Sequence, residues 1–359
     1  MNCRSCGFSN TPGSRFCSSC GTLLPRTCDS CESPLVAGAR FCANCGTPVV
    51  SDTQGRPSAA IRADVPFAHP FLYIKARSLV LWTVLSVPVL IILYVLAAAS
   101  ATAGEEIDPF FESLIFSSWL YGLLALWCIW KSAQKRVDFG LLIGRIPAGY
   151  HWLPVLGVVA LLMVFSISTF WLFLYWLAVN FPDAADFFAE GEFFVTSESS
   201  RYSGLYNTQV FIMAVFVAPV IEEFVFRGIL LTRWSLKWGT TSGIFVSSLV
   251  FALLHADLLG SFAFGVAMSL LYLQTRTLLV PMMAHALNNL VVAELSVLVL
   301  AIETGESASL AADLESGLML AVVGALLMLP LVLWYFVRNW PRGGETVPYL
   351  AREPSTSQE

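Results

Sequence analysis

The sequence predicts an all-α polytopic membrane protein with about eight transmembrane helices, preceded by a small cysteine-rich module. Composition is the first reason, because 57% of the 359 residues are hydrophobic and 13% are charged, whereas soluble domains carry about 25% charged residues. The second reason is that the apolar residues gather in runs near the roughly 20 residues that a helix needs to span a bilayer. The third is that eight of the nine cysteines lie within residues 3–45.

The apolar runs define the predicted spans, which cover residues 77–100, 112–131, 151–180, 208–232, 240–257, 260–276, 278–301 and 316–338. The fifth and sixth runs are short and nearly contiguous, separated by a turn around Asp257–Gly260. Lys and Arg gather before the first run and after the second, fourth, sixth and eighth, whereas Asp and Glu dominate the other loops. Because basic residues are retained in cytoplasmic loops, this alternation predicts that both termini are cytoplasmic.

The N-terminal module contains the pattern Cys-x2-Cys-x10-Cys-x2-Cys twice. The cysteines are Cys3, Cys6, Cys17 and Cys20 in the first copy and Cys28, Cys31, Cys42 and Cys45 in the second. Each copy supplies the four thiolates of a tetrahedral zinc site. Disulfides are disfavoured on the cytoplasmic side, and no βαβ pattern accompanies the motifs as a redox fold would require. Four thiolates leave no open position on the metal, so both zinc ions are predicted to be structural.

This module resembles the double zinc-ribbon domains found at the ends of many prokaryotic proteins. The resemblance implies an interaction module that recruits a cytoplasmic protein partner, and it favours the plasma (inner) membrane of a prokaryote as the location. The predicted organisation is therefore a double zinc ribbon at 1–47, a flexible linker at 48–72, a transmembrane domain at 73–340 with its motif core at 208–300, and a disordered cytoplasmic tail at 341–359.

Charged residues inside the fourth span are the strongest functional signal. Glu222, Glu223 and Arg227 lie in an otherwise apolar run, where each carboxylate at the bilayer centre costs roughly 2.5–3.5 kcal/mol on insertion scales. Such residues are retained for function by default. Glu223 and Arg227 are four residues apart, on one helical face, and could form an ion pair that limits the net buried charge.

Two later spans add histidines and an amide. His255 follows Phe251 by four residues, and His285 precedes Asn289 by four, so each pair is expected on one face of its helix. One carboxylate could activate a water as general base, with a histidine sharing that water and a His–Asn pair stabilising the oxyanion. Alternatively, a glutamate and the two histidines could hold a catalytic zinc with one position open for water.

Each of these features also has a structural explanation. A histidine in a membrane helix commonly serves as an interhelical hydrogen-bond partner, a Glu–Arg pair can act as a clamp, and asparagines such as Asn288 and Asn289 can hold helices together. A proton relay in a transporter would also use intramembrane Glu and His, but no inverted repeat or pair of broken half-helices is evident.

The motifs Glu-Glu-x3-Arg, Phe-x3-His and His-x3-Asn, in this order on successive spans, resemble those of the CPBP or Abi family of intramembrane proteases. That family includes type II CAAX prenyl endopeptidases and bacteriocin-processing or immunity proteins. The resemblance covers roughly residues 140–300 and implies that Glu222 and His255 activate water while His285 and Asn289 stabilise the oxyanion. The Glu223–Arg227 pair would support the site.

The sequence thus predicts an intramembrane endopeptidase that cleaves a membrane-associated protein or peptide. Metal-dependent and metal-free glutamate mechanisms both stay open. Its expected surroundings are the lipid bilayer and the peptide substrate, and no nucleic acid is expected. The alternative is a non-catalytic membrane scaffold or immunity-type protein that recruits partners through its zinc ribbons.

Overall fold

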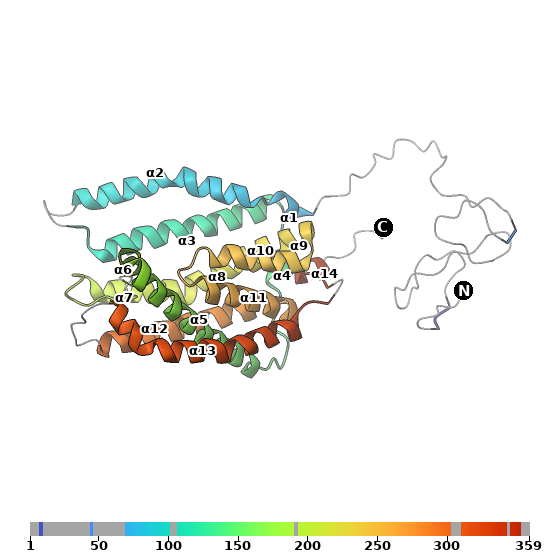
Figure 1. Cartoon of the computed structure of the whole chain (residues 1–359). Coiled ribbons are helices and arrows are strands. Elements are labelled where there is room, and N and C mark those ends of the chain that lie inside the picture. The colour runs from blue at the N-terminus through green and yellow to red at the C-terminus, as the bar shows by residue number, and fades with distance from the viewer. Residues whose placement is uncertain are drawn as a thin grey trace. The chain divides into compact units, whose positions relative to one another are not determined.

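The structure is a computed structural model, and the residues it describes are 7–9, 44–45, 69–100, 106–189, 193–302, 310–342 and 345–352. The chain divides into two compact units, Met1–Phe67 and Ala68–Glu359. In the first unit Cys45 is described and is exposed, whereas the other seven predicted zinc ligands lie outside the described residues. In the second unit the described elements are helices, and the longer ones form a bundle (Figure 1).

The elements follow one another along the second unit without a strand among the described residues. They are α1 Pro70–Tyr73, α2 Ala76–Ser100, α3 Pro109–Gln134, α4 Phe139–Ile143, α5 Leu153–Asn180, α6 Pro182–Ala189, α7 Ser203–Ile212, the π-helix η1 Met213–Val217, α8 Ala218–Glu223, the π-helix η2 Phe224–Leu231, α9 Thr232–Trp238, α10 Thr240–Ala252, α11 Leu258–Thr275, α12 Leu279–Ile302, α13 Leu310–Asn339 and α14 Pro348–Arg352.

Among the described residues, six helices are long and apolar enough to cross a membrane. They are Ala76–Ala99, Pro109–Gln134, Leu153–Asn180, Ser203–Trp238, Leu258–Thr275 and Leu314–Asn339. These match the first four, the sixth and the eighth predicted spans, which confirms the class of helical membrane protein. The seventh predicted span corresponds to α12, which has 24 residues.

The fifth predicted span differs from the structure. The prediction ran over 240–257, but α10 ends at Ala252 and has only 13 residues. At 1.5 Å per residue it is about 20 Å long, shorter than the roughly 30 Å hydrocarbon core. Residues 253–257 form the turn into α11, which packs beside α10, so the two helices make a hairpin that enters the bundle and returns (Figure 1).

Helix α11 is the centre of the bundle. Of its apolar window 72% is buried, against 0% for α2, and it contacts α5, α10, α12, α13 and η2. Small residues allow the close approach of α10, since a Cβ added to Gly265 would lie 2.9 Å from the Cβ of Ser248. Membrane helices commonly pack through such small residues. The two helices of the hairpin are therefore held tightly together.

Apolar side chains cover the outside of the bundle, as lipid contact requires. Leu85 on α2 is 66% exposed and Leu320 on α13 is 77% exposed. The predicted disordered tail at 341–359 differs from the structure in part, because α14 lies within it and Tyr349 is buried. The ring of Tyr349 packs against Phe71 with ring centroids 4.9 Å apart. Aromatic packing therefore orders this part of the tail.

Candidate active site

One long helical segment, Ser203–Trp238, carries the two glutamates at its middle. Glu222 and Glu223 end the short α-helix α8, which lies between the π-helices η1 and η2. A π-helix has one residue more in each hydrogen-bonded turn than an α-helix, and such segments often occur at functional sites. The two glutamates therefore lie where the helix departs twice from regular geometry.

Pro219 accounts for the first π-helix. A proline inside a helix has no N–H and its ring clashes with the preceding turn, and the helix accommodates it because the N–H of Ala218 bonds to the carbonyl of Met213 five residues earlier. In this register the donor for the Ala214 carbonyl would be Pro219, which has none. The side-chain nitrogen of Asn289 donates to that carbonyl instead, at 2.8 Å. Asn289 thereby joins α12 to the irregular turn before the glutamates.

Glu223 and Arg227 form the buried ion pair that their spacing predicts. Their side chains are 0% and 1% exposed, and Nη1 of Arg227 lies 2.9 Å from Oε1 of Glu223. Nη2 of Arg227 donates to the carbonyl of Gly265 on α11 at 3.2 Å, and the guanidinium lies 4.6 Å from the ring centroid of Phe251 on α10. The pair therefore ties the glutamate helix to both helices of the hairpin.

The hydrogen bonds of the two histidines assign their ring protons. Nδ1 of His285 lies 3.0 Å from Oε1 of Glu223, and Nδ1 of His255 lies 2.8 Å from the carbonyl oxygen of Phe251. Carboxylate and carbonyl oxygens only accept hydrogen bonds, so Nδ1 carries the proton in both rings. In each histidine Nε2 then lies on the side of the ring opposite the oxygen that Nδ1 contacts.

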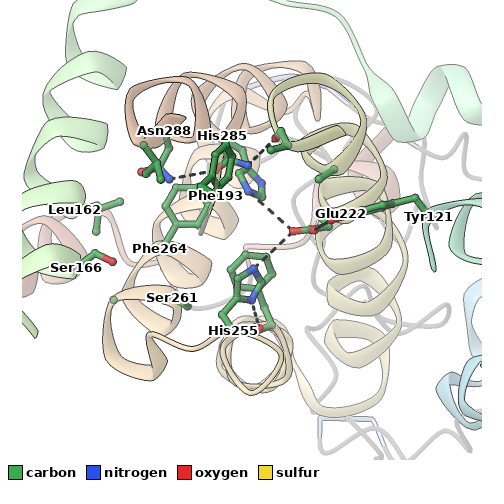
Figure 2. Close-up of a pocket in the computed structure, with 16 residues that line it drawn as sticks. Tyr121, Leu162, Ser166, Phe193, Glu222, His255, Ser261, Phe264, His285 and Asn288 are labelled. Carbon is green, nitrogen blue, oxygen red and sulfur yellow. Dashed lines mark hydrogen bonds and ion pairs between the residues drawn. The ribbon is translucent and has the colours of Figure 1, made fainter. Parts of the chain in front are cut away.

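Both Nε2 atoms point at Glu222. Each lies 4.0 Å from Oε2 of the Glu222 carboxylate, and this oxygen is buried without a hydrogen-bond partner among the described residues. Figure 2 shows the carboxylate between the two imidazoles, with Tyr121 on its other side. The structure thus brings together residues from α8, α12 and the turn after α10, as the motifs predict.

These groups line a cavity of about 230 Å³. Glu222, His255, His285, Asn288 and Asn289 lie on its wall, and the remaining lining is mostly aromatic and aliphatic. Glu223 and Arg227 are not part of the lining and lie behind it. Asn288 donates to Oδ1 of Asn289 at 3.3 Å. Nδ2 of Asn289 bonds to the carbonyl of Ala214, so its second hydrogen has no partner among the described residues. The cavity combines a small polar centre with apolar walls, as binding pockets commonly do.

The turn that carries His255 is anchored by residues that the motifs do not include. Asp257 caps α11 by accepting from the N–H of Gly260 at 3.0 Å, and it also accepts a hydrogen bond from Ser166 on α5. An aspartate at an N-cap satisfies one of the free donors of the first turn. The sequence predicts a turn around Asp257 without giving this residue a role. The feature that could have predicted the role is an aspartate directly before an apolar run, which is typical of a helix N-cap.

Tyr121 is the second residue at the site that the motifs do not reveal. It lies on α3, and its hydroxyl donates to Oε1 of Glu222 at 3.1 Å. A tyrosine in an apolar span is ordinary, so its identity alone carries no signal. The available signal was the spacing of polar residues on α3, where Ser113, Ser117 and Tyr121 recur every four residues.

The distances between the three groups leave room for an ordered water and are longer than the distances between the ligands of a bound zinc ion. Two ligands of a tetrahedral zinc with bonds of about 2.0–2.1 Å are about 3.3 Å apart, which is shorter than the 4.0 Å from either Nε2 to Oε2. An oxygen that makes hydrogen bonds of about 2.8 Å to two groups separates them by about 4–5 Å. Within the described parts of the chain, no group of three His, Cys, Asp or Glu side chains is arranged to hold a metal.

The fold and this site define an integral membrane protein of helical class with a glutamate–histidine cavity inside its bundle. Residues 205–291 match the family model of type II CAAX prenyl endopeptidase Rce1-like proteins, and residues 3–46 match the double zinc ribbon. These matches confirm both resemblances, and the Rce1-like domain supports an intramembrane protease of the CAAX type in general. No curated protein and no solved structure matches the chain.

The second match bears on metal content. The matched segment 3–46 contains all eight cysteines of the two repeated patterns. A double zinc ribbon holds structural zinc, so this comparison supports the predicted structural metal in the N-terminal unit. Such small modules draw most of their folding free energy from the metal.

Proposed function

We propose that this protein is an intramembrane endopeptidase in which Glu222 activates a water molecule to hydrolyse a peptide bond of a membrane-associated protein or peptide. The observation that carries the proposal is the convergence of both histidine Nε2 atoms on Oε2 of Glu222, each at 4.0 Å, in a cavity lined by apolar side chains. A carboxylate in such a place with no partner for Oε2 is suited to accept a proton from a water that fits between the three groups.

The reaction that we propose uses these positions as follows. Glu222 takes a proton from the water while His255 accepts the hydrogen bond of its second proton, and the water oxygen bonds to the carbonyl carbon of the substrate. The resulting oxyanion is stabilised by His285 and by the free hydrogen on Nδ2 of Asn289. The bond from carbon to nitrogen then breaks, and Glu222 passes its proton to the departing nitrogen. The products are a carboxylic acid and an amine.

The buried charges support the role of His285 in this scheme. Glu222 and Glu223 bring two negative charges to the site and Arg227 brings one positive charge. A second proton on His285 would make the set neutral, and Glu223 lies 3.0 Å from Nδ1 to stabilise it. With both ring nitrogens protonated, His285 would donate from Nε2 to the oxyanion while its Nδ1 stays bonded to Glu223. Glu223 and Arg227 thus support the chemistry from outside the cavity.

The test compares new N-termini in the membrane proteome of cells that express the wild type or Glu222→Gln at equal levels. The substitution keeps the volume of the side chain but removes the base, so we expect wild-type-specific termini to fall by at least about 100-fold. Glu294→Gln, an exposed glutamate on α12 away from the cavity lining, is the matched control and should cleave as the wild type does. Equal termini from the wild type and Glu222→Gln would favour a non-catalytic scaffold.

A further inference from the structure

The Glu222 carboxylate has a hydrogen-bond partner that comes from outside the family motifs. Tyr121 lines the cavity from α3, and its hydroxyl donates to Oε1 of Glu222 at 3.1 Å. Helix α3 lies outside the segment 205–291 that matches the Rce1-like model. The contact therefore joins a helix without motif residues to the group that we propose as general base.

This hydrogen bond separates the roles of the two carboxylate oxygens. With Oε1 engaged by Tyr121, Oε2 is the oxygen that faces both histidines, and it has no hydrogen-bond partner among the described residues. The histidine rings are held by their own Nδ1 bonds, but the described partner of the Glu222 side chain is Tyr121. Without it the carboxylate could rotate about its last side-chain bond, which is a soft torsion.

The position of Tyr121 is itself built into the packing of α3. Ser113, Ser117 and Tyr121 are spaced four residues apart, so they share one face of α3. Oγ of Ser113 donates to Oε1 of Gln209 on α7 at 3.0 Å, and Nε2 of Gln209 donates to Oγ of Ser117 at 2.8 Å. Tyr121 makes the third bond of this polar seam, one turn further on. The seam holds α3 against the glutamate helix in register with Glu222.

We propose that Tyr121 is a positioning residue that orients Glu222 so that Oε2 faces the water and the two histidines. This inference rests on the proposed peptidase function. An orienting role of Tyr121 can be told apart from a role in stability. Loss of orientation slows the chemical step and leaves substrate binding intact, whereas loss of stability lowers the amount of folded enzyme.

The experiment measures kcat, KM and the thermal midpoint for the wild type, Tyr121→Phe and Tyr335→Phe, with a peptide taken from the wild-type-specific termini. We expect Tyr121→Phe to lower kcat by about 10- to 100-fold with KM within twofold of the wild type. Tyr335→Phe removes a buried hydroxyl that has no hydrogen-bond partner among the described residues. It should leave both constants unchanged.

A second variant protects the test against misfolding of Tyr121→Phe. Replacing Tyr121 by 3-fluorotyrosine keeps the ring and the hydroxyl donor, so this variant should retain a kcat within about threefold of the wild type. If 3-fluorotyrosine at this position is as impaired as phenylalanine, the orienting role of the hydroxyl is wrong. A loss in Tyr121→Phe that only follows its folded fraction would also overturn the inference.

The same measurements separate this inference from the proposed function. Unaltered cleavage by Glu222→Gln would refute the peptidase mechanism itself. Cleavage that is abolished in Glu222→Gln but proceeds with wild-type kcat in Tyr121→Phe would leave the mechanism standing and would refute the role of Tyr121.

Discussion

At the scale of single residues, Arg227 decides whether Glu223 can exist inside the bundle. Both side chains are almost completely buried, and the guanidinium also bonds to the carbonyl of Gly265. Buried ion pairs add little net stability compared with apolar residues, but removal of one partner leaves an unpaired charge. The main effect of the pair is therefore to keep Glu223 in place to hold His285, which bonds to the same Glu223 oxygen.

Arg227→Ala should destabilise the protein strongly for this reason. We expect it to lower the free energy of unfolding by about 3–5 kcal/mol, the cost of an uncompensated buried charge, and to lower the thermal midpoint in detergent accordingly. Arg338→Ala removes an exposed arginine on α13 and is the control, with an expected change below about 0.5 kcal/mol. Equal thermal midpoints for Arg227→Ala and the wild type would contradict the clamp.

The motif residues could be predicted from the sequence because charge and imidazole are rare in apolar runs and therefore informative. Glu222, His255 and His285 were identified in this way, and the structure places them around one point. Tyr121 could not be identified by its rarity, since tyrosine is common in membrane helices. What makes it relevant is a contact between α3 and α8. The four-residue spacing of Ser113, Ser117 and Tyr121 marks a polar face of α3, but it does not identify the residue that this face meets.

At the scale of elements, the hairpin of α10 and α11 positions His255. The imidazole lies beyond the end of α10 and is attached to it by the bond from Nδ1 to the carbonyl of Phe251. The expected four-residue relation between the two residues is thus kept by a turn and a side-chain bond instead of a continuous helix. Sequence periodicity predicted the proximity but not the end of the helix, because residues 253–254 are two further leucines.

Gly260 tests the anchoring of this turn. A Cβ at this position would overlap the side chains of Asp257 and Ser166, so Gly260→Ala must displace the contact between the turn and α5. We expect a loss of about 1–3 kcal/mol in the free energy of unfolding, as in other overpacked sites, and at least tenfold slower cleavage because His255 moves with the turn. The measurements are the thermal midpoint in detergent and the rate of peptide cleavage.

Gly157 supplies the matched control on α5. A Cβ added there meets nothing within 4 Å, so Gly157→Ala should keep the wild-type stability and cleavage rate. If Gly260→Ala behaves like Gly157→Ala in both measurements, the turn adapts freely and the anchoring role of Asp257 and Ser166 is wrong.

At the scale of the whole molecule, the hairpin changes how the crossings are counted without changing which side the ends are on. If α10 enters and α11 returns, the hairpin replaces two full crossings, and the number of crossings stays even. The alternation of basic and acidic loops is preserved for the same reason, since the basic residues after the fourth and sixth predicted spans lie at the two ends of the hairpin. The cytoplasmic location of both termini stays a prediction.

The two units also differ in what stabilises them, so a structural metal in the ribbons and a catalytic metal in the membrane cavity are separate questions. The membrane unit has an extended apolar core centred on α11, whereas modules as short as a double zinc ribbon draw most of their folding free energy from zinc. The distances around Glu222 are longer than those between the ligands of a bound zinc ion. We therefore expect zinc in the ribbons alone, and removal of metal should leave the chemistry of the membrane cavity intact.

Chelation of the full-length chain tests whether the membrane cavity works without metal, provided that the chain used has no zinc in its ribbons. A variant with serine at the eight ribbon cysteines should contain no zinc by elemental analysis, whereas the wild type should contain about two ions per chain. If the cavity works with water alone, 1,10-phenanthroline leaves the variant's cleavage of a short peptide unchanged. Cleavage that phenanthroline abolishes and added Zn²⁺ restores would instead place a metal between Glu222, His255 and His285. The three side chains would then have to close from 4.0 Å to about 3.3 Å around the ion.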